Sequence, residues 1–267
     1  MGRVMTYSLT ADLASGALAD VLADLAEEAA RVILPYWRAD AEVITKADDS
    51  PVTQADRAAE ALILAQLETR YPGVQTVAEE AVAEDGAPTS TRDLFWLIDP
   101  LDGTRGFIRG GEAYTVNIAL VQGNRVVAGV VTAPATATTW VSGVRDGSPV
   151  ALRRRFGDGW QVVRVRPRPD APQAVVSHTM TDEEATRLAA RHGCVQWQGT
   201  DSSLKFCLIA EGRFDAYPRT GPTHEWDTAA GHAVLEAAGG RVLAEDGQTL
   251  AYGKPGFWNG PFVALGG

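Results

Sequence analysis

Residues 94–104 read Leu-Phe-Trp-Leu-Ile-Asp-Pro-Leu-Asp-Gly-Thr, and this stretch decides the fold. Its first five residues are apolar or aromatic, which predicts a buried strand. Two carboxylates follow at the end of that strand, where buried charge is costly unless something compensates it. Because Asp99 and Asp102 repel each other when they are close, a divalent cation is the usual compensation.

The other residues of this turn also suit a cation site. The backbone carbonyl of Leu101 offers a further oxygen ligand, and Gly103 allows a close approach to the backbone. Thr104 supplies a hydroxyl and a candidate helix N-cap. Taken alone, the stretch is equally compatible with a plain Asp-Gly turn after a core strand.

Three acidic residues elsewhere stand at similar junctions. Glu79 ends a short apolar stretch and belongs either to a solvated loop or to the same acidic cluster. Asp227 precedes a small-residue helix that ends in glycines, so an N-cap and a metal ligand are both open for it. Thr53 and Asp56 have capping-box spacing before an apolar helical run, which predicts that a helix begins there.

These motifs together resemble the inositol monophosphatase superfamily, whose members are magnesium-dependent, lithium-sensitive phosphomonoesterases. The resemblance rests on the acid pair at 79–80, Asp-Pro-Leu-Asp-Gly-Thr at 99–104 and Trp-Asp at 226–227, in matching order from Lys46 to Gly240. It implies a layered αβαβα sugar-phosphatase fold of the α+β or α/β class with two packed lobes.

Within the superfamily, the chain is similar to the 3′(2′),5′-bisphosphate nucleotidases. This similarity is carried by Lys46 and by residues 50–53, 116–120, 176–178, 202–212 and 215–231. Two positions depart from the pattern of that branch. Arg105-Gly106 stands where Lys-Glu is usual, and Asp201 stands where bacterial members often have glycine. Neither departure touches an expected metal ligand, but both bear on substrate preference.

The resemblance implies two Mg²⁺ sites and a weaker third. One ion is expected on Glu79, Asp99 and the Leu101 carbonyl, and the other on Asp99, Asp102 and Asp227. The third ion is expected near Glu79, through water molecules.

The resemblance also implies a catalytic pair. Thr104, oriented by Asp56, is expected to help deprotonate the attacking water, while the backbone at Gly103 and Thr104 donates to phosphate oxygens.

Four further residues are implied for the nucleotide. Ser202, Lys205 and Arg219 are expected to hold its second phosphate and sugar, with His178 near its base. Ordinary structural roles are the alternative for three of them: an exposed helix lysine, a turn arginine and a strand-end histidine.

The implied reaction removes the 3′-phosphate of 3′-phosphoadenosine 5′-phosphate, which recycles this nucleotide in sulfur assimilation. Inositol 1-phosphate and histidinol phosphate are the rival substrates. A catalytically inactive nucleotide-sensing regulator on the same fold is an alternative of a different class. Loss of a carboxylate ligand would favour that alternative, and none of the expected ligands is missing from the sequence.

The bulk composition sets outer limits on function. The chain has 267 residues, of which 45% are hydrophobic and 22% charged, as in a globular protein, and its net charge of −10 disfavours a nucleic acid polymer as partner. With only two cysteines, we expect no disulfide framework. The sequence shows neither a membrane-spanning run nor a signal-peptide core, so we expect a cytoplasmic protein, with peripheral association at the inner membrane left open. The sequence does not indicate an oligomeric state.

The order of elements predicts two lobes. An α+β lobe over 1–166 carries most metal ligands, and an α/β lobe over 167–267 carries the substrate residues and Asp227. The proline-rich stretch 167–172 marks the boundary. Arg153-Arg154-Arg155 is interpreted as the solvated edge of a hairpin. The predicted helices lie at 18–33, 53–71, 182–192, 202–211 and 227–238, and the predicted strands at 94–98, 115–121, 126–131, 138–141, 174–177 and 214–217.

Overall fold

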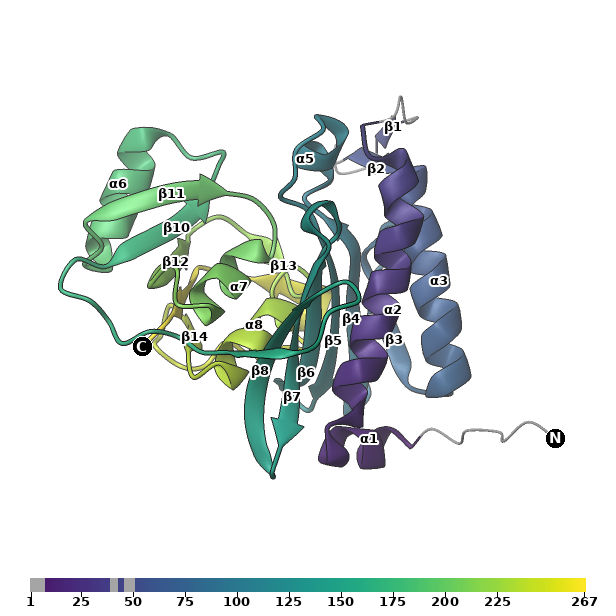
Figure 1. Cartoon of the computed structure of the whole chain (residues 1–267). Helices are drawn as coiled ribbons and strands as arrows, with labels where there is room; N and C mark the ends of the chain where they lie inside the picture. The colour runs from purple at the N-terminus through teal and green to yellow at the C-terminus, as the bar shows by residue number, and fades with distance from the viewer. Residues whose placement is uncertain (1–7, 39–42, 46–50) are drawn as a thin grey trace.

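The computed structural model describes residues 8–38, 43–45 and 51–267. Its elements form five layers (Figure 1). Helices α2 (Ala17–Ile33) and α3 (Gln54–Arg70) cover one face of a seven-stranded sheet, and α7 (Leu204–Ala210) and α8 (Ala229–Ala237) cover the other. A five-stranded sheet follows, with α6 (Asp182–Arg191) on its outer side. The predicted αβαβα fold is thereby confirmed.

The seven-stranded sheet is a meander except at one edge. Its strands are β3 (Gln75–Ala78), β4 (Leu94–Asp102), β5 (Thr115–Gln122), β6 (Arg125–Ala133), β7 (Thr138–Arg145), β8 (Ser148–Arg155) and β9 (Gln161–Val163), in that spatial order. Only β3 and β4 pair in parallel. Gly123 and Asn124 connect β5 to β6 as a two-residue hairpin, a connection that glycine and asparagine favour.

The five-stranded sheet is mixed. It runs β11 (Gln196–Thr200), β10 (Gln173–Ser177), β12 (Ala216–Arg219), β16 (Phe262–Leu265) and β14 (Arg241–Ala244). The first three strands are parallel, so their carboxyl ends meet at one edge of the sheet. Two short pairs complete the strands: β1 (Val43–Thr45) with β2 (Pro51–Thr53), and β13 (Thr223–His224) with β15 (Trp258–Asn259).

The remaining helices are short. They are α1 (Leu9–Ser15), α4 (Glu79–Asp85), α5 (Thr104–Ile108) and the 3₁₀ turns η1 (Leu34–Tyr36), η2 (Pro134–Thr136) and η3 (Pro255–Phe257). No helix of the described residues is both long enough and apolar enough to cross a bilayer.

Helix α3 begins where its capping box predicts. The Thr53 hydroxyl accepts from the Ala55 backbone N–H, and the Asp56 carboxylate accepts from the Thr53 N–H at 2.8 Å. Two N–H groups at the helix start are thus satisfied. Asp56 is therefore held in place at the first turn of α3.

The predicted strand 94–98 is four residues too short. Strand β4 continues to Asp102, with Asp99 opposite Asn117 and Asp102 opposite Thr115, and a register shift lies between them. The two residues between the aspartates form an irregularity in the ladder rather than a turn after it. Bulges of this kind redirect side chains beside functional sites.

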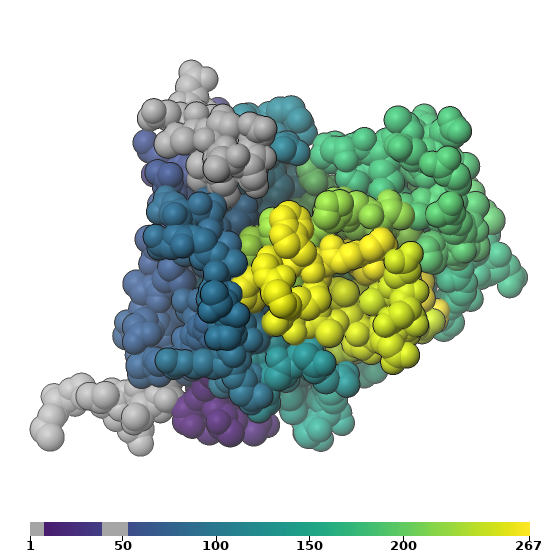
Figure 2. Space-filling view, turned by 180° about the vertical axis from the view of Figure 1, so that it is seen from behind, coloured from purple at the N-terminus to yellow at the C-terminus, as the bar shows by residue number. Residues whose placement is uncertain are grey.

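The two halves of the chain share one hydrophobic core. Phe95 of the large sheet belongs to the same buried cluster as Phe206 and Trp226 from the second half. Seen from behind, the C-terminal segment lies between the part around residues 70–100 and the part around residues 170–200 (Figure 2). The large sheet ends before residue 166 and the smaller one begins after it, while the lobe boundary itself stays a prediction.

The interpretation of residues 153–155 as a solvated edge is wrong for Arg154. Its side chain is only 15% exposed, and its guanidinium lies 2.7 Å from both Asp24 and Glu27 of α2. These acids are more than 120 positions away in the sequence, so no local pattern indicates the pairing.

Candidate active site

A pocket of about 460 Å³ opens between the two sheets. Every metal ligand predicted from the sequence lines it, together with residues from both halves of the chain. The lining consists of Glu79, Asp99, Leu101, Asp102, Gly103, Thr104, Arg105, Arg109, Ser177, His178, Thr179, Asp201, Arg219, Pro222, Thr223, His224, Asp227 and Trp258.

The irregular end of β4 shapes the floor of the pocket. Asp99 is buried, and its carboxylate accepts from the Leu101 N–H at 3.0 Å, within the irregular part of the ladder. Gly103 then adopts φ +94°, and an added Cβ would lie 3.0 Å from the Ala113 carbonyl oxygen. This position therefore requires glycine.

Thr104 does not cap the following helix. Gly103 occupies the N-cap position of α5, and Thr104 is its first residue. The Thr104 hydroxyl instead lies 3.2 Å from the Asp56 carboxylate and 3.0 Å from the Leu101 carbonyl, to which it donates. The structure thus brings Thr104 and Asp56 together.

Asp56 is almost fully buried, with 1% of its surface exposed. Burial raises its pKa above the ordinary value, although hydrogen bonds from Thr53 lower it. The Thr53 hydroxyl donates to the same carboxylate at 2.6 Å. A carboxylate with a raised pKa that contacts a hydroxyl is well suited to take up a proton.

Glu79 is placed by another carboxylate that the sequence did not single out. Buried Glu60 of α3 accepts from the N–H groups of Glu80 and Ala81, both at 2.9 Å. These donors lie at the start of α4, where backbone N–H groups lack partners within the helix. Glu60 thereby holds the first turn of α4, and with it Glu79, at the pocket.

Asp227 stands one residue before the N-cap of α8, which is Thr228, so it is not the cap itself. Its carboxylate accepts from the His224 N–H at 2.8 Å. Its backbone carbonyl accepts from the Ser203 hydroxyl at 2.6 Å, and the Ser203 N–H donates to Asp102 at 2.5 Å. Ser203 therefore ties the two aspartates together.

The carboxylates disfavour one another's charge. Burial raises the pKa of Asp102 to about 6, Lys205 opposes this rise, and Asp201 and Glu79 add to it. Burial also raises the pKa of Asp227 well above its ordinary value, with Asp102 and Glu79 contributing. Such a cluster is stabilised in its charged form when a cation joins it.

The donor set fits a hard divalent cation, because the four carboxylates predicted as ligands and the residue that offers its carbonyl, Leu101, line a single pocket. Among the described residues, however, no group of three or more His, Cys, Asp or Glu side chains is arranged to hold a metal ion as it stands.

His178 links the two halves across the pocket. Its Nε2 lies 3.2 Å from an Arg109 guanidinium nitrogen, and its Nδ1 lies 3.3 Å from the Asp201 carboxylate. Because arginine only donates, Nε2 accepts and the ring proton of the neutral imidazole sits on Nδ1, facing Asp201. The unusual acid at position 201 therefore orients His178.

The predicted phosphate residues lie at different depths. Arg219 lines the pocket and donates to the carbonyls of Gly221 and Pro222. Ser202 and Lys205 are buried and do not line it, and the Lys205 ammonium donates to the Ser202 carbonyl at 2.7 Å. Burial lowers the pKa of Lys205 to about 8, while Asp102 and Asp201 raise it. Lys46 and Ser50 lie outside the described residues.

A stack of aromatic rings reaches the mouth of the pocket. Buried Trp226 stacks on His224 with ring centroids 4.3 Å apart, and the ring centroids of His224 and Trp258 are 3.8 Å apart. Trp258 is 52% exposed and lines the pocket. The sequence reasoning missed Trp258, because an isolated tryptophan near the C-terminus belongs to no motif.

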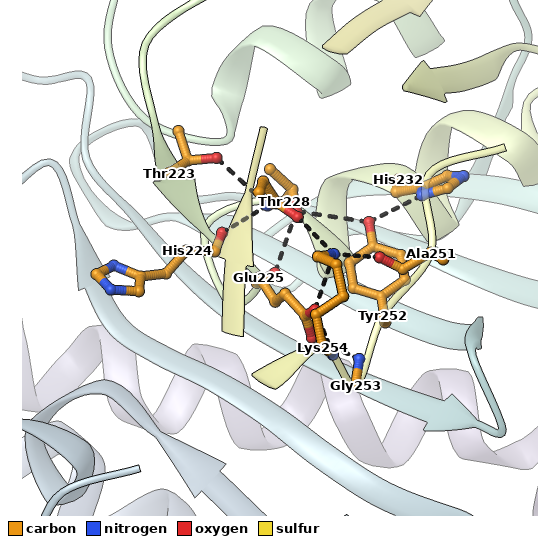
Figure 3. A network of polar contacts seen from close by, with 10 residues as sticks. Thr223, His224, Glu225, Thr228, His232, Ala251, Tyr252, Gly253 and Lys254 are labelled. Carbon is orange, nitrogen blue, oxygen red and sulfur yellow. Dashed lines mark hydrogen bonds and ion pairs between the residues drawn. The ribbon is translucent and has the colours of Figure 1, made fainter. Parts of the chain in front are cut away.

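A polar network next to this stack holds β13 and β15, the two strands that carry His224 and Trp258. Figure 3 shows the network. Fully buried Glu225 accepts from the N–H groups of Gly253 and Lys254, and it pairs with the Lys254 ammonium at 2.8 Å. Asn259 donates to the His224 carbonyl at 2.9 Å. The backbone on both sides of the ring stack is therefore fixed, and sequence reasoning missed this network too.

The fold and this site define a phosphatase class, and the chain belongs to the inositol monophosphatase family. The model of that family matches residues 17–262.

Individual relatives carry a more specific name. The chain is 42% identical over 214 residues to the 3′(2′),5′-bisphosphate nucleotidase CysQ of Salmonella typhimurium, covering 79% of this chain and 83% of that protein. It is 33% identical over 250 residues to the CysQ of Buchnera aphidicola, covering 92% of each. The crystal structure of CysQ from Bacteroides thetaiotaomicron superposes with a TM-score of 0.75 at 32% identity, covering 94% of this chain and 97% of that one.

Proposed function

We propose that this protein is a Mg²⁺-dependent 3′(2′),5′-bisphosphate nucleotidase that converts 3′-phosphoadenosine 5′-phosphate to AMP and phosphate. The observation that carries the proposal is the convergence of the predicted ligands on one pocket beside the Thr104–Asp56 contact. The names of the relatives support the nucleotide substrate.

We assign the metal ligands as the sequence predicts. Glu79, Asp99 and the Leu101 carbonyl would hold one Mg²⁺, and Asp99, Asp102 and Asp227 would hold another, with a weaker third near Glu79. When bound, the ions polarise the phosphate and lower the pKa of a water molecule. Asp99 is shared, so its loss affects both main sites.

Thr104 and Asp56 form the proton-accepting pair. The hydroxyl that contacts Asp56 at 3.2 Å stands at the start of α5, next to the backbone N–H groups of residues 103 and 104. These N–H groups donate to phosphate oxygens in this proposal, as first-turn donors of a helix do. The attacking water passes its proton toward Thr104 and Asp56, so no covalent phosphoenzyme is required.

The nucleotide occupies the rest of the pocket. Arg219 contacts its second phosphate, and His178 lies beside its base. Trp258 offers an exposed aromatic face in the same pocket, and bases stack readily on such faces. Direct contact of Ser202 or Lys205 with the substrate stays a prediction, and localisation of the reaction to the cytoplasm does as well.

A substrate panel tests the proposal. Phosphate release from 3′-phosphoadenosine 5′-phosphate, inositol 1-phosphate and histidinol phosphate is compared at equal Mg²⁺ concentration. We expect the highest kcat/KM for the bisphosphate nucleotide. A preference for either of the other two substrates contradicts the nucleotidase assignment, and no phosphate release from any of them supports an inactive sensor.

A further inference from the structure

Asn117 is buried and does not line the active-site pocket. It stands in β5 directly opposite Asp99 of β4, so the two side chains share one face of the large sheet. The Asn117 amide nitrogen donates to the Asp102 carboxylate at 3.4 Å and to the Ser203 hydroxyl at 3.0 Å. Asn117 therefore connects an assigned metal ligand in the first half of the chain to a residue of the second half.

Ser203 extends this connection to a second aspartate. Its hydroxyl donates to the Asp227 carbonyl at 2.6 Å, and its backbone N–H donates to the Asp102 carboxylate at 2.5 Å. Ser203 is the N-cap of α7, yet its side chain makes no capping hydrogen bond. The hydroxyl thus serves the chain before α8 rather than its own helix. We call Asn117 and Ser203 together the amide–hydroxyl clamp.

The clamp engages only one oxygen of Asp102. Both donors, the Asn117 amide and the Ser203 N–H, contact Oδ2, so the clamp does not engage Oδ1. The Asp227 carboxylate is fixed separately, by the His224 N–H at 2.8 Å. Because Asp102 and Asp227 repel each other, donors that hold both residues in place keep them from moving apart before an ion binds.

The stability of the fold does not account for an amide at position 117. The Asn117 Oδ1 atom is buried and has no hydrogen-bond partner among the residues that the structure describes. An unpaired buried acceptor costs stability, and an apolar side chain of the same shape would avoid that cost. What asparagine offers over leucine here is the nitrogen that donates to Asp102 and Ser203.

We propose that Asn117 and Ser203 are positioning residues that set the affinity of the pocket for its divalent cation. This inference rests on the proposed function, which assigns a cation to Asp102 and Asp227. Neither clamp residue lines the pocket, so both act through the two aspartates, one from each half of the chain. Loss of such supporting partners commonly weakens metal binding by roughly 10- to 100-fold.

The test measures Mn²⁺ binding to the substrate-free protein through the electron paramagnetic resonance signal of free Mn²⁺, an ion that takes the same oxygen ligands as Mg²⁺. The variants are Asn117→Leu, which keeps the side-chain shape, and Ser203→Ala, which keeps the N–H that donates to Asp102. We expect the Kd for Mn²⁺ to rise about tenfold or more in each variant. Because the two residues form one clamp, the double variant should show a rise clearly smaller than the product of the single effects.

Thermal unfolding in the absence of metal separates positioning from support of the fold. Asn117→Leu removes the unpaired acceptor, so its Tm should stay at or above the wild-type value. The matched control is Ser142→Ala, which removes a buried hydroxyl that accepts from the Gly129 N–H at 2.9 Å, away from the pocket. This control should lower Tm and leave the Kd for Mn²⁺ within about twofold. A rise in Kd for Asn117→Leu that comes with a fall in Tm as large as that of the control would show a structural role and overturn the proposal.

Turnover distinguishes this inference from the proposed reaction. At saturating Mg²⁺, KM for 3′-phosphoadenosine 5′-phosphate should be the same in Asn117→Leu as in the wild type, since the clamp acts on the cation and not on the nucleotide. If the Kd for Mn²⁺ stays at the wild-type value in both single variants, the clamp does not position the ligands, whereas the nucleotidase reaction stands. If the wild type binds no Mn²⁺ and hydrolyses the nucleotide without a metal ion, the proposed metal-dependent function fails, and the clamp inference fails with it.

Discussion

The substitution Asp56→Asn separates the catalytic from the structural role of the Thr104–Asp56 contact. Asparagine has the same shape but keeps only one acceptor oxygen. That oxygen can still accept from the Thr53 N–H and hydroxyl, which lie 2.8 and 2.6 Å from one carboxylate oxygen. The amide group then faces Thr104, whose hydroxyl can still donate to the Leu101 carbonyl at 3.0 Å.

This geometry makes the structural cost small and the catalytic cost large. The capping box survives, and the site already disfavours the charge, since burial raises the pKa of Asp56. We expect the free energy of unfolding to fall by about 1–2 kcal/mol, the value of a weakened hydrogen bond. Loss of a positioned proton acceptor should lower kcat by roughly 10²- to 10⁴-fold.

The matched control is Glu27→Gln, which alters a buried carboxylate far from the pocket. Glu27 lies 2.7 Å from Arg154 and accepts from Thr139 at 3.2 Å. Losing this charge-assisted bond should cost about 1.5–3 kcal/mol of stability, or roughly 3–10 °C in Tm, and leave kcat within about twofold.

Thermal unfolding and steady-state phosphate release on both variants make the comparison. We expect Asp56→Asn to show the smaller loss of Tm and the far larger loss of kcat. A kcat within threefold of wild type for Asp56→Asn would refute the assignment of Asp56 and Thr104 as the proton-accepting pair.

Three further predictions follow from the same structure. Li⁺ at millimolar concentration should inhibit phosphate release, because it would compete with Mg²⁺ for the site assigned to Asp99, Asp102 and Asp227 without supplying equal charge. No inhibition in a Li⁺ titration would count against that assignment. Trp258→Ala should raise KM for the nucleotide about tenfold and leave turnover of inositol 1-phosphate unchanged, since only a base loses a stacking surface; equal effects on both substrates would show a general distortion. Burial raises the pKa of Asp215, but the Arg166 guanidinium and the Gln173 N–H lower it more, so that the net pKa lies below 3.8. Asp215 therefore contributes stability at neutral pH that is lost as the pH falls from about 3.8 through the lowered pKa of the folded state, and the Tm difference between wild type and Asp215→Asn should shrink steadily over that acid range; a difference that stays as large at the most acid pH measured as at neutral pH would contradict this assignment.

Local signals in the sequence predicted much of the fold. The capping box at Thr53 predicts the start of a helix, and the apolar run before Asp99 predicts a strand. Both α3 and β4 begin where these local patterns place them. The two-residue turn at Gly123 is equally local. The predicted end of β4 was wrong because an irregular ladder depends on the partner strand β5, which no pattern within 94–104 describes.

Contacts between distant residues were beyond local patterns. Glu60 holds the start of α4 from 20 positions away, and Asp201 orients His178 across two strands. Neither contact has a periodicity or a spacing that points to it. The resemblance named residues for the pocket, but it did not indicate the exposed face of Trp258 or the burial of Lys205, because both follow from how the C-terminal strands pack.

The position of the phosphate that is released distinguishes a 3′-nucleotidase reaction from every alternative. Wild type and Asp99→Asn are incubated with 3′-phosphoadenosine 5′-phosphate and Mg²⁺, and the products are identified by ³¹P NMR. We expect adenosine 5′-monophosphate and inorganic phosphate from the wild type, and no product from Asp99→Asn or from wild type in excess chelator. Adenosine 3′-monophosphate as product, or full activity without Mg²⁺ or without Asp99, would contradict it.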